Sequence, residues 1–354
     1  MTSMIKVGIF GGSGYVGGEL LRILLGHDDV EVTFISSKRH EDKAVHKVHP
    51  QLRGLTDLKF SSPTVSEAAG KADLFFLALP HGSSAPFAVE LLKLKKRVID
   101  LSADFRLKNK DDYEKWYHWK HPFPELLQKA VLGLPELHRK EIVSADLVAV
   151  PGCMATAAIL GLLPIVAKGM VNTNPIVIDA KIGSSGGGSS PTLEGYHPER
   201  YSVVRAYIPV GHRHIAEIEQ EVGSVAAERV VVSFTPHAVN MVRGILCTIH
   251  TFQRRKLENK DVWKAYRESY EGEPFVRLVK DPTMLHGLPD PKILVGSNYC
   301  DIGFELDDHA DRLVIFSAID NLIKGAAGNA VQCMNLMAGI EESKGLKSPG
   351  IHPV

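Results

Sequence analysis

Cys153 is the residue of this sequence whose surroundings best suit covalent chemistry. It follows Pro151-Gly152 and opens an apolar stretch, 153–166, with the character of a buried helix. Backbone N–H groups and the helix dipole stabilise a thiolate in the first turn of a helix. The pattern therefore predicts a nucleophile at Cys153. The remaining cysteines lie within apolar patterns and are interpreted as buried structural residues: Cys247, Cys300 and Cys333.

A nucleophilic cysteine needs an acid–base partner, for which histidine is the usual choice. The chain has 16 histidines, so a single one is weak evidence. The run Gly211-His212-Arg213-His214 stands out because it follows an apolar strand and opens a helix. The two histidines have a metal-like spacing but no acid or cysteine partner nearby, so no metal site is predicted. Read alone, the run could also be two polar residues at a helix start.

A glycine-rich segment near the start of the chain has the form of a nucleotide-binding turn. The apolar strand 5–10 runs directly into Gly11-Gly12-Ser13-Gly14-Tyr15-Val16-Gly17, and a helical pattern, 15–25, follows. This is a GxxGxxG variant of the dinucleotide fingerprint, in which glycines let the backbone approach a pyrophosphate. A plain glycine-rich turn is the alternative. We expect six of these residues to bind the cofactor: Gly11, Ser13, Gly14, Tyr15, Val16 and Gly17.

The end of the second strand, 32–35, indicates which dinucleotide is used. NAD sites usually place an acidic residue there for the ribose hydroxyls. Here the residues are Ser36, Ser37, Lys38 and Arg39, and two hydroxyls with two cations suit a 2′-phosphate. The sequence therefore predicts NADP, with a solvated basic turn as the alternative.

The elements that position these residues form two groups. The first half alternates short apolar strands with helical patterns, which predicts a parallel sheet covered on both faces. The second half has several consecutive strands near its end, which indicates a mixed α+β domain. We therefore predict an α/β protein. Its Rossmann domain, 1–150, is completed by the C-terminal helix region at about 324–354, and a catalytic α+β domain spans 151–323. The expected strands are 5–10, 32–35, 74–79, 98–101, 147–150, 176–182, 230–234, 244–252, 293–295 and 313–318, and the expected helices are 15–25, 85–94, 153–166, 214–227, 261–270 and 324–337.

Composition excludes several classes of protein. The formal net charge is zero, so the electrostatic footprint of a nucleic-acid binder is missing. No apolar run reaches the roughly 18 residues that span a bilayer, so no membrane segment is predicted. Four cysteines in 354 residues do not make a disulfide scaffold, and a reducing, cytoplasmic compartment is expected.

Several motifs together resemble the N-acetyl-γ-glutamyl-phosphate reductase family over nearly the whole chain. The glycine turn resembles the family's GASGYTG fingerprint, Leu101 to Arg106 its DLSADFR motif, and Pro151-Gly152-Cys153 its nucleophile motif. Residues 211–218 match its GHRHxPEI motif, with Ala216 where proline is usual, and 296–299 and 320–328 match C-terminal motifs. The resemblance implies a second domain of the semialdehyde dehydrogenase type, for catalysis and dimerisation, in a homodimer or homotetramer.

A finer resemblance separates two branches of this family. Residues 45–50, 197–200 and 289–291 look like the lysine-biosynthetic branch. That branch reduces an α-aminoadipyl or glutamyl phosphate carried on a small acidic amino-group carrier protein. The arginine branch, which reduces the free N-acetyl compound, is the alternative. An acidic carrier needs a basic rim, and Arg200, Arg205 and Lys47 are the candidates.

The resemblance also implies a mechanism. Cys153 attacks the acyl phosphate to leave a thioester, which NADPH reduces to a semialdehyde. His212 is favoured as acid–base over His214 because Arg205 lies seven residues ahead of it, as in the related aspartate-semialdehyde dehydrogenases. Arg106 is a candidate phosphate clamp, with a structural salt bridge as the alternative, and Arg205 is a second candidate contact to the substrate. The 183–190 run, with Ser184 and Gly186, offers backbone N–H groups for the phosphate, or is only a mobile loop. Asn321 is a candidate contact to the nicotinamide, with a helix N-terminal cap as the alternative.

Three rival functions share parts of these patterns. An aspartate-semialdehyde or glyceraldehyde-phosphate dehydrogenase uses the same cofactor and cysteine, but the GHRH and DLSADFR motifs argue against it. A Cys–His hydrolase has no use for a dinucleotide fingerprint. A non-catalytic NADP-binding sensor has no need for a thiol at the start of a helix.

Overall fold

The computed structural model describes residues 4–354 and divides them into two compact units. The first consists of residues 4–151 with Ala326–Ser348, and the second of Gly152–Gly325 with Pro349–Val354. The sequence analysis assigned all of 324–354 to the first domain. Pro349–Val354 belong instead to the second unit, because the N–H of Ile351 donates to the Val295 carbonyl at 2.8 Å.

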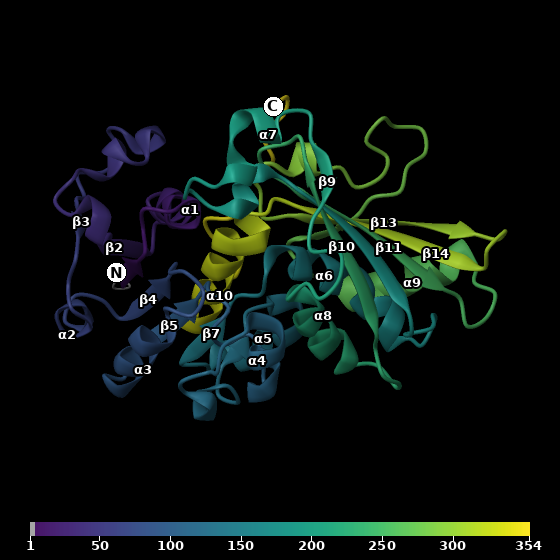
Figure 1. Ribbon diagram of the computed structural model, residues 1–354, viewed down its shortest axis with the longest axis horizontal. Helices are drawn as coiled ribbons and strands as arrows, with labels where there is room; N and C mark the ends of the chain where they lie inside the picture. The colour runs from purple at the N-terminus through teal and green to yellow at the C-terminus, as the bar shows by residue number, and fades with distance from the viewer. Residues whose placement is uncertain (1–3) are drawn as a thin grey trace. The chain divides into compact units, whose positions relative to one another are not determined.

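The first unit is built on a parallel sheet whose described strands follow the order β3-β2-β1-β4-β5-β7-β6 (Figure 1). The central strands are almost continuously apolar and buried, as expected for a parallel sheet covered on both faces. The strands are β1 (Ile5–Phe10), β2 (Val30–Ser36), β3 (Phe60–Ser61), β4 (Leu74–Leu77), β5 (Arg97–Asp100), β6 (Val131–Leu132) and β7 (Leu147–Ala149).

Helices of the first unit pack in two groups. α10 contacts both α1 and α5, although it comes from the end of the chain, and α2 contacts α3. α10 therefore completes this unit, in the place expected for the last predicted helix. The helices are α1 (Tyr15–Leu24), α2 (Val65–Ala69), α3 (Ala85–Lys93), α4 (Lys110–Tyr117), α5 (Pro135–Val143) and α10 (Gly328–Ala338).

The second unit is built on a mixed sheet, with its described strands in the order β12-β13-β14-β11-β8-β10-β9. β8 pairs with β10 and β12 with β13 in parallel, and the other neighbours are antiparallel. The strands are β8 (Ile176–Ile182), β9 (Val204–Ala206), β10 (Val232–Val239), β11 (Ile245–Phe252), β12 (Val276–Leu278), β13 (Cys300–Asp307) and β14 (Arg312–Ile319). The helices are α6 (Cys153–Ala167), α7 (His197–Arg200), α8 (His214–Gly223) and α9 (Asn259–Tyr270).

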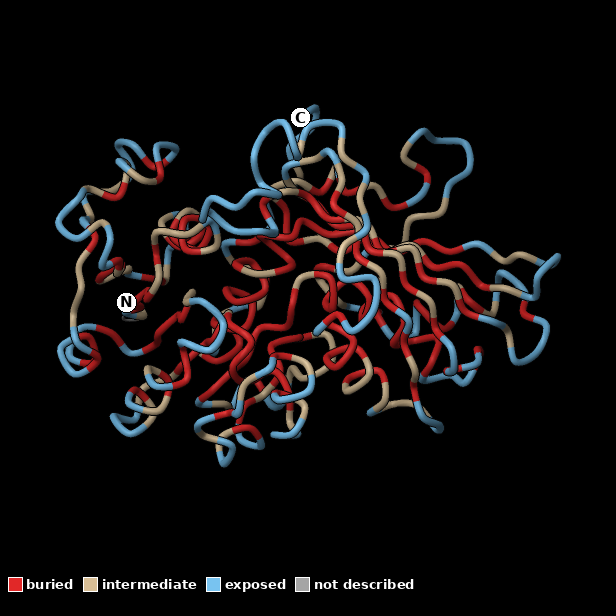
Figure 2. The backbone as a smooth tube through the Cα atoms, in the orientation of Figure 1, coloured by how far each residue is buried: buried red, intermediate tan, exposed pale blue. Residues whose placement is uncertain are grey.

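Helix α6 is the centre of the second core. It contacts α8, α9 and strands β8, β11 and β14, and it is buried from Met154 to Val166. β8 and β10 alternate between buried and half-buried or exposed residues, which appears as striped strands in Figure 2. The sheet thus packs one face against α6 and leaves the other partly open, as antiparallel and mixed sheets commonly do.

The predicted fold class, a Rossmann unit followed by an α+β unit, is confirmed. The strand predicted at 293–295 is wrong. Pro291 has no N–H for a ladder, and the Asp290 carboxylate accepts the Lys292 N–H at 2.9 Å, so Pro291–Leu294 forms a 3₁₀ turn. The last predicted helix, 324–337, begins with a π-helical turn, Ile323–Ala327, ahead of α10.

Candidate active site

The glycine turn between β1 and α1 is bonded to the end of β2. The N–H of Gly12 donates to the Ser36 carbonyl at 2.8 Å, and that of Gly11 to the Ser36 hydroxyl at 3.3 Å. The Ser37 hydroxyl donates to the Ser13 hydroxyl at 3.0 Å. The two halves of the predicted cofactor site therefore meet at the carboxyl edge of the parallel sheet, where this kind of fold binds ligands.

Two glycines of the turn explain its shape. A Cβ on Gly17 would lie 2.6 Å from the Cα of Gly12, so α1 packs this closely only with glycine there. A Cβ built on Gly14, the N-cap of α1, would meet nothing within 4 Å. The space before this helix N-terminus is open, and the N–H groups there suit a pyrophosphate. The exposed Tyr15 and the half-buried Val16 form the first turn.

Lys38 and Arg39 lie directly after β2, in a short 3₁₀ turn, and are exposed. Neither forms an ion pair with another residue of the described chain. Two cations that lack a carboxylate partner beside Ser36 and Ser37 fit the 2′-phosphate of NADP.

His49 fixes the glycine turn by a hydrogen bond to its backbone, a contact that was not predicted from the sequence. Its Nε2 donates to the Gly12 carbonyl at 2.8 Å, and a Cβ on Gly18 would lie 2.6 Å from its Nδ1. The sequence analysis used His49 only as part of the 45–50 motif. No local pattern could have linked it to a turn 37 residues away.

Arg106, the predicted phosphate clamp, is buried in the first unit. Its Nε donates to the Val150 carbonyl at 2.8 Å and its Nη2 to the Leu101 carbonyl at 3.1 Å. The guanidinium therefore ties together the ends of β5 and β7, and its phosphate contact stays a prediction. Asp104 of the same motif accepts three backbone N–H groups at 2.6 to 3.0 Å and so fixes the start of α3; the donors are Gly82, Ser84 and Ala85.

Cys153 is the first residue of α6, as the sequence predicts, and it is only partly buried. The N-cap residue Gly152 donates its N–H to Glu217 Oε2 at 2.7 Å. On another side, a Cβ on Gly325 would lie 2.6 Å from the Cβ of Cys153. Cys153 is thus held between two glycines in a position at which a helix N-terminus would stabilise a thiolate. The remaining three cysteines are buried thiols, as predicted.

His214 lies against the backbone of the Pro151-Gly152-Cys153 turn. A Cβ on Gly152 would lie 2.3 Å from His214 Nε2, so only glycine allows this approach. Its Nε2 is 4.0 Å from Oε1 of Glu217, which is fully buried on the same helix, α8. Glu217 therefore links the two predicted motifs, since one oxygen binds the Gly152 N–H and the other faces the imidazole. The sequence analysis did not single out Glu217.

His212 is buried beside His214, with ring centroids 4.7 Å apart, and it also packs on Phe234. Its Nδ1 accepts the His214 N–H at 3.2 Å. A ring nitrogen that accepts a backbone N–H carries no proton, so the neutral ring holds its proton on Nε2. Burial, with a smaller effect of the Arg213 charge, lowers the pKa of His212 to about 4. His212 is therefore a neutral hydrogen-bond donor at pH 7.

Tyr207 is a further polar residue of this site that the sequence analysis missed. It follows β9, and its ring lies 6.3 Å from that of His212. Burial, and then the charge of Cys153, raise the pKa of Tyr207 to about 12. The phenol is therefore protonated at pH 7.

Asn321 and the 183–190 run are joined in the second unit. Asn321 Oδ1 accepts the Gly244 N–H at 2.8 Å, and its Nδ2 donates to the Ser185 hydroxyl at 2.9 Å. The Ser184 N–H donates to the Met241 carbonyl and the Gly186 N–H to the Gly183 carbonyl. The amide groups proposed for phosphate binding are therefore already bonded, and Ser184 has its hydroxyl left to offer.

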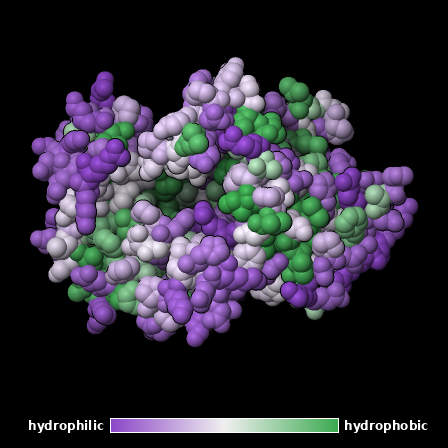
Figure 3. All heavy atoms as spheres, in the orientation of Figure 1, coloured by the Kyte–Doolittle hydropathy of each residue, from purple (hydrophilic) through white to green (hydrophobic). Residues whose placement is uncertain are grey.

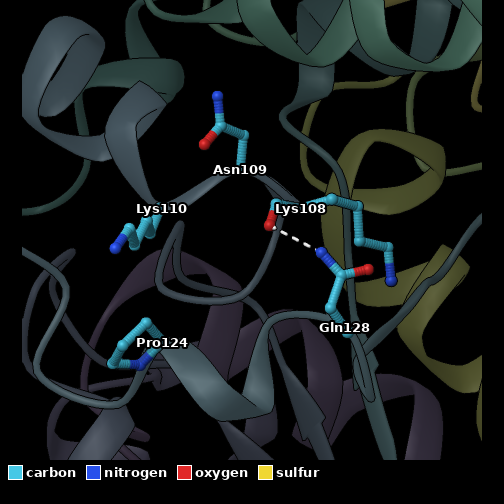
Figure 4. Close-up of a pocket in the computed structure, with 5 residues that line it drawn as sticks. All are labelled: Lys108, Asn109, Lys110, Pro124 and Gln128. Carbon is cyan, nitrogen blue, oxygen red and sulfur yellow. Dashed lines mark hydrogen bonds between the residues drawn. The ribbon is translucent and has the colours of Figure 1, made fainter.

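A hollow of about 400 Å³ on the first unit is lined by none of these residues (Figure 4). The Lys108 ammonium donates to the carbonyls of Leu127 and Ala130, and Gln128 donates to the Lys108 carbonyl. The polar groups of Lys108 and Gln128 thus bind backbone carbonyls, and the residues that line the hollow do not suggest catalysis. In the described chain, no group of three His, Cys, Asp or Glu side chains could hold a metal ion.

Comparison with known proteins identifies the family. Residues 6–145 match the family model for the semialdehyde dehydrogenase NAD-binding domain, and 153–321 match that for the dimerisation domain. A relative from Saccharolobus solfataricus, a LysW-L-2-aminoadipate/LysW-L-glutamate phosphate reductase, is 48% identical over 353 residues, 100% of both chains. The chain belongs to this family of phosphate reductases. A relative from Pyrobaculum aerophilum, named for the same activity, is 54% identical over 99% of this chain and 100% of its own length.

The family confirms the resemblance seen in the sequence, including the lysine-biosynthetic branch, and makes the protein an oxidoreductase with an NAD(P)-binding domain. Aspartate semialdehyde dehydrogenase from Candida albicans, solved with NADP, has a TM-score of 0.70 over 95% of this chain and 99% of its own, at 16% identity. This likeness shows the fold alone. Within residues 4–354, the helices fall short of the length and apolar character needed to cross a bilayer.

Proposed function

We propose that the protein uses NADPH to reduce a carrier-bound α-aminoadipyl or glutamyl phosphate to the semialdehyde, with release of phosphate. The observation that carries the proposal is Cys153 at the first position of α6, beside two buried histidines. The carrier protein enters through the names of the relatives, which specify LysW-linked substrates.

The first unit supports the choice of cofactor. The open space at Gly14 fits a pyrophosphate, and Lys38 and Arg39 lie where a 2′-phosphate would bind. When bound there, NADPH supplies the hydride that reduces the acyl group.

Cys153 performs the covalent step. Its thiolate attacks the acyl carbon, an S–C bond forms, the C–O bond to phosphate breaks, and phosphate leaves with that electron pair. The product is a thioester on Cys153. After reduction of the thioester carbon, the C–S bond breaks, its electron pair returns to sulfur, and the aldehyde leaves. The Gly152 N–H bond to Glu217 keeps the turn that presents the sulfur rigid throughout.

His212 acts on the oxygen atom of the acyl group. Because the ring is neutral with its proton on Nε2, it donates a hydrogen bond to the oxygen as negative charge develops there. Because the pKa is lowered to about 4, the ring stays neutral rather than becoming an imidazolium near pH 7. Arg205 and the Ser184 hydroxyl are the proposed contacts to the rest of the substrate.

The second unit is the proposed site of assembly into a homodimer or homotetramer. Its family model is that of a dimerisation domain. Apolar patches lie around β9 and β10 (Figure 3), and Val204 and Val210 expose 79% and 82% of their surface. Exposed apolar patches of this kind mark protein–protein contacts.

The proposal is tested by a comparison of substrates. Phosphate-dependent reduction of NADP⁺ is measured with a carrier-bound semialdehyde and with free N-acetylglutamate semialdehyde, at matched concentrations. The proposal predicts a kcat/KM at least about 100-fold higher for the carrier-bound compound, since only that substrate adds carrier contacts. A preference for the free compound would place the enzyme in the arginine branch.

A further inference from the structure

Two arginines of the second unit have no carboxylate partner among the described residues. Arg200 ends α7 and Arg205 lies in β9, and both are half-buried. Neither forms an ion pair within the described part of the chain. Arg200 donates from Nη2 to the Ile182 carbonyl at 3.0 Å, whereas its Nε is buried and lacks a hydrogen-bond acceptor among the described residues.

The backbone of β9 brings Arg205 and Tyr207 to the same face. Arg205 pairs with Ala238 of β10, and the Tyr207 N–H continues the pairing with a bond to the Pro236 carbonyl at 3.0 Å. Residues two apart on a strand point to the same side. Arg200 lies across the same sheet: its guanidinium binds the Ile182 carbonyl, Ile182 pairs with Ala238, and Ala238 pairs with Arg205. Burial lowers the pKa of Arg200, Tyr207 opposes this effect, and the charge of Arg205 adds to it.

This group adjoins the nucleophile. The carbonyl that Arg200 binds belongs to Ile182, the last residue of β8, which directly precedes the Ser184 loop. Tyr207 lies beside the His212 ring, and His212 packs against His214. His214 in turn touches the position of Gly152, the residue before Cys153. The two guanidiniums therefore stand at the edge of the reacting centre.

Two neighbouring cations, one with a buried orphan donor, are unfavourable until an anion joins them. Guanidinium groups bind carboxylates and phosphates with paired, charge-assisted hydrogen bonds. We propose that Arg200 is a substrate-binding residue, and that Arg200 and Arg205 together bind an oxyanion of the substrate beside Cys153. This inference deepens the proposed function, because the substrate offers two such groups, a carboxylate and the phosphate.

The first test measures the subsite without turnover. Cys153 is alkylated with iodoacetate, which carries a carboxylate, and with iodoacetamide, which does not. The ratio of the two rates reports an anion site next to the sulfur. Arg200→Gln keeps a donor for the Ile182 carbonyl but removes the charge, and Arg200→Lys keeps the charge. The exposed Arg255 provides the control variant, Arg255→Gln.

We expect the iodoacetate-to-iodoacetamide ratio to fall by about fivefold or more in Arg200→Gln, as for loss of a charge-assisted hydrogen bond. It should recover in part in Arg200→Lys and stay unchanged in Arg255→Gln. An unchanged ratio in a folded Arg200→Gln protein overturns the proposal. Because no substrate is involved, the result is independent of whether the proposed reaction is correct.

The second test identifies the oxyanion. In the reverse reaction, inorganic phosphate and the semialdehyde enter separately, so each has its own KM. If the KM of Arg200→Gln rises about tenfold for phosphate alone, the subsite binds phosphate. If its KM rises for the semialdehyde alone, the subsite binds the carboxylate. If neither KM changes and only kcat falls, Arg200 does not bind substrate and the proposal fails.

Discussion

The close approach of His214 to Gly152 offers a steric test of the site. Gly152 has ordinary extended angles, φ −63° and ψ 143°, which alanine adopts without strain. Its Cβ would nevertheless lie 2.3 Å from His214 Nε2 and 2.8 Å from Cδ2, whereas ordinary contacts begin near 3.4 Å. The Gly152→Ala substitution must therefore displace the imidazole by roughly 1 Å within a packed core. We expect a loss of about 1–3 kcal/mol in stability, typical of overpacking.

The effect on catalysis should be larger than the effect on stability. A displacement of about 1 Å in a catalytic group can reduce the rate by about 100-fold. We expect Gly152→Ala to lower kcat by that order and to leave the dissociation constant for NADP⁺ unchanged. Urea unfolding, steady-state kinetics and cofactor fluorescence titration measure the three quantities.

Gly223→Ala is the matched control for this substitution. Gly223 is the last residue of α8, the helix that begins at His214, and a Cβ there would meet nothing within 4 Å. The control should be neutral or slightly stabilising, since alanine restricts the unfolded chain. If Gly152→Ala matches the control in stability and kcat, the contact between Gly152 and His214 is not as close as described here.

Two further predictions concern cofactor choice and acid–base chemistry. Replacing Lys38 and Arg39 together by alanine should raise the KM for NADPH about tenfold or more and barely change that for NADH, as spectrophotometric assays can measure; equal use of both cofactors by the wild type would refute the NADP assignment. His212→Asn should slow single turnover by about 100-fold or more, and His214→Asn by less. Because the pKa of His212 is lowered to about 4, the ring stays neutral and kcat should not fall through its titration between pH 7 and 5; a loss centred near pH 6.5 that His212→Asn abolishes would contradict this.

Much of the first unit could be predicted from local sequence, because its strands are buried on both faces. The apolar runs predicted at 5–10 and 74–79 correspond to β1 and β4. β13 was missed although a signal exists: Cys300, Ile302 and Phe304 alternate with polar residues or glycine, which is typical of a strand. β3 and β6 span two residues each, too few for any periodicity.

The functional site was predictable only where one motif contains the chemistry. Cys153 and the two histidines could be singled out because a helix start creates their environment locally. Glu217 could not, since its bond to Gly152 spans 65 residues and exists only after α6 and α8 pack together. Arg200 was predicted only as a docking residue for the carrier, because a sequence does not reveal which arginines lack a carboxylate partner. Such relations depend on tertiary contacts rather than on spacing.

The central claim is that Cys153 carries the acyl group during turnover. It is tested most directly by mixing the enzyme with the carrier-bound acyl phosphate in the absence of NADPH, followed by rapid quenching. The account predicts one phosphate released per active site and the mass of the acyl-carrier group on the peptide that contains Cys153; Cys153→Ser should show neither and should lose activity by several powers of ten. Turnover without this adduct, or a Cys153→Ser enzyme within about tenfold of wild type, would contradict the covalent mechanism.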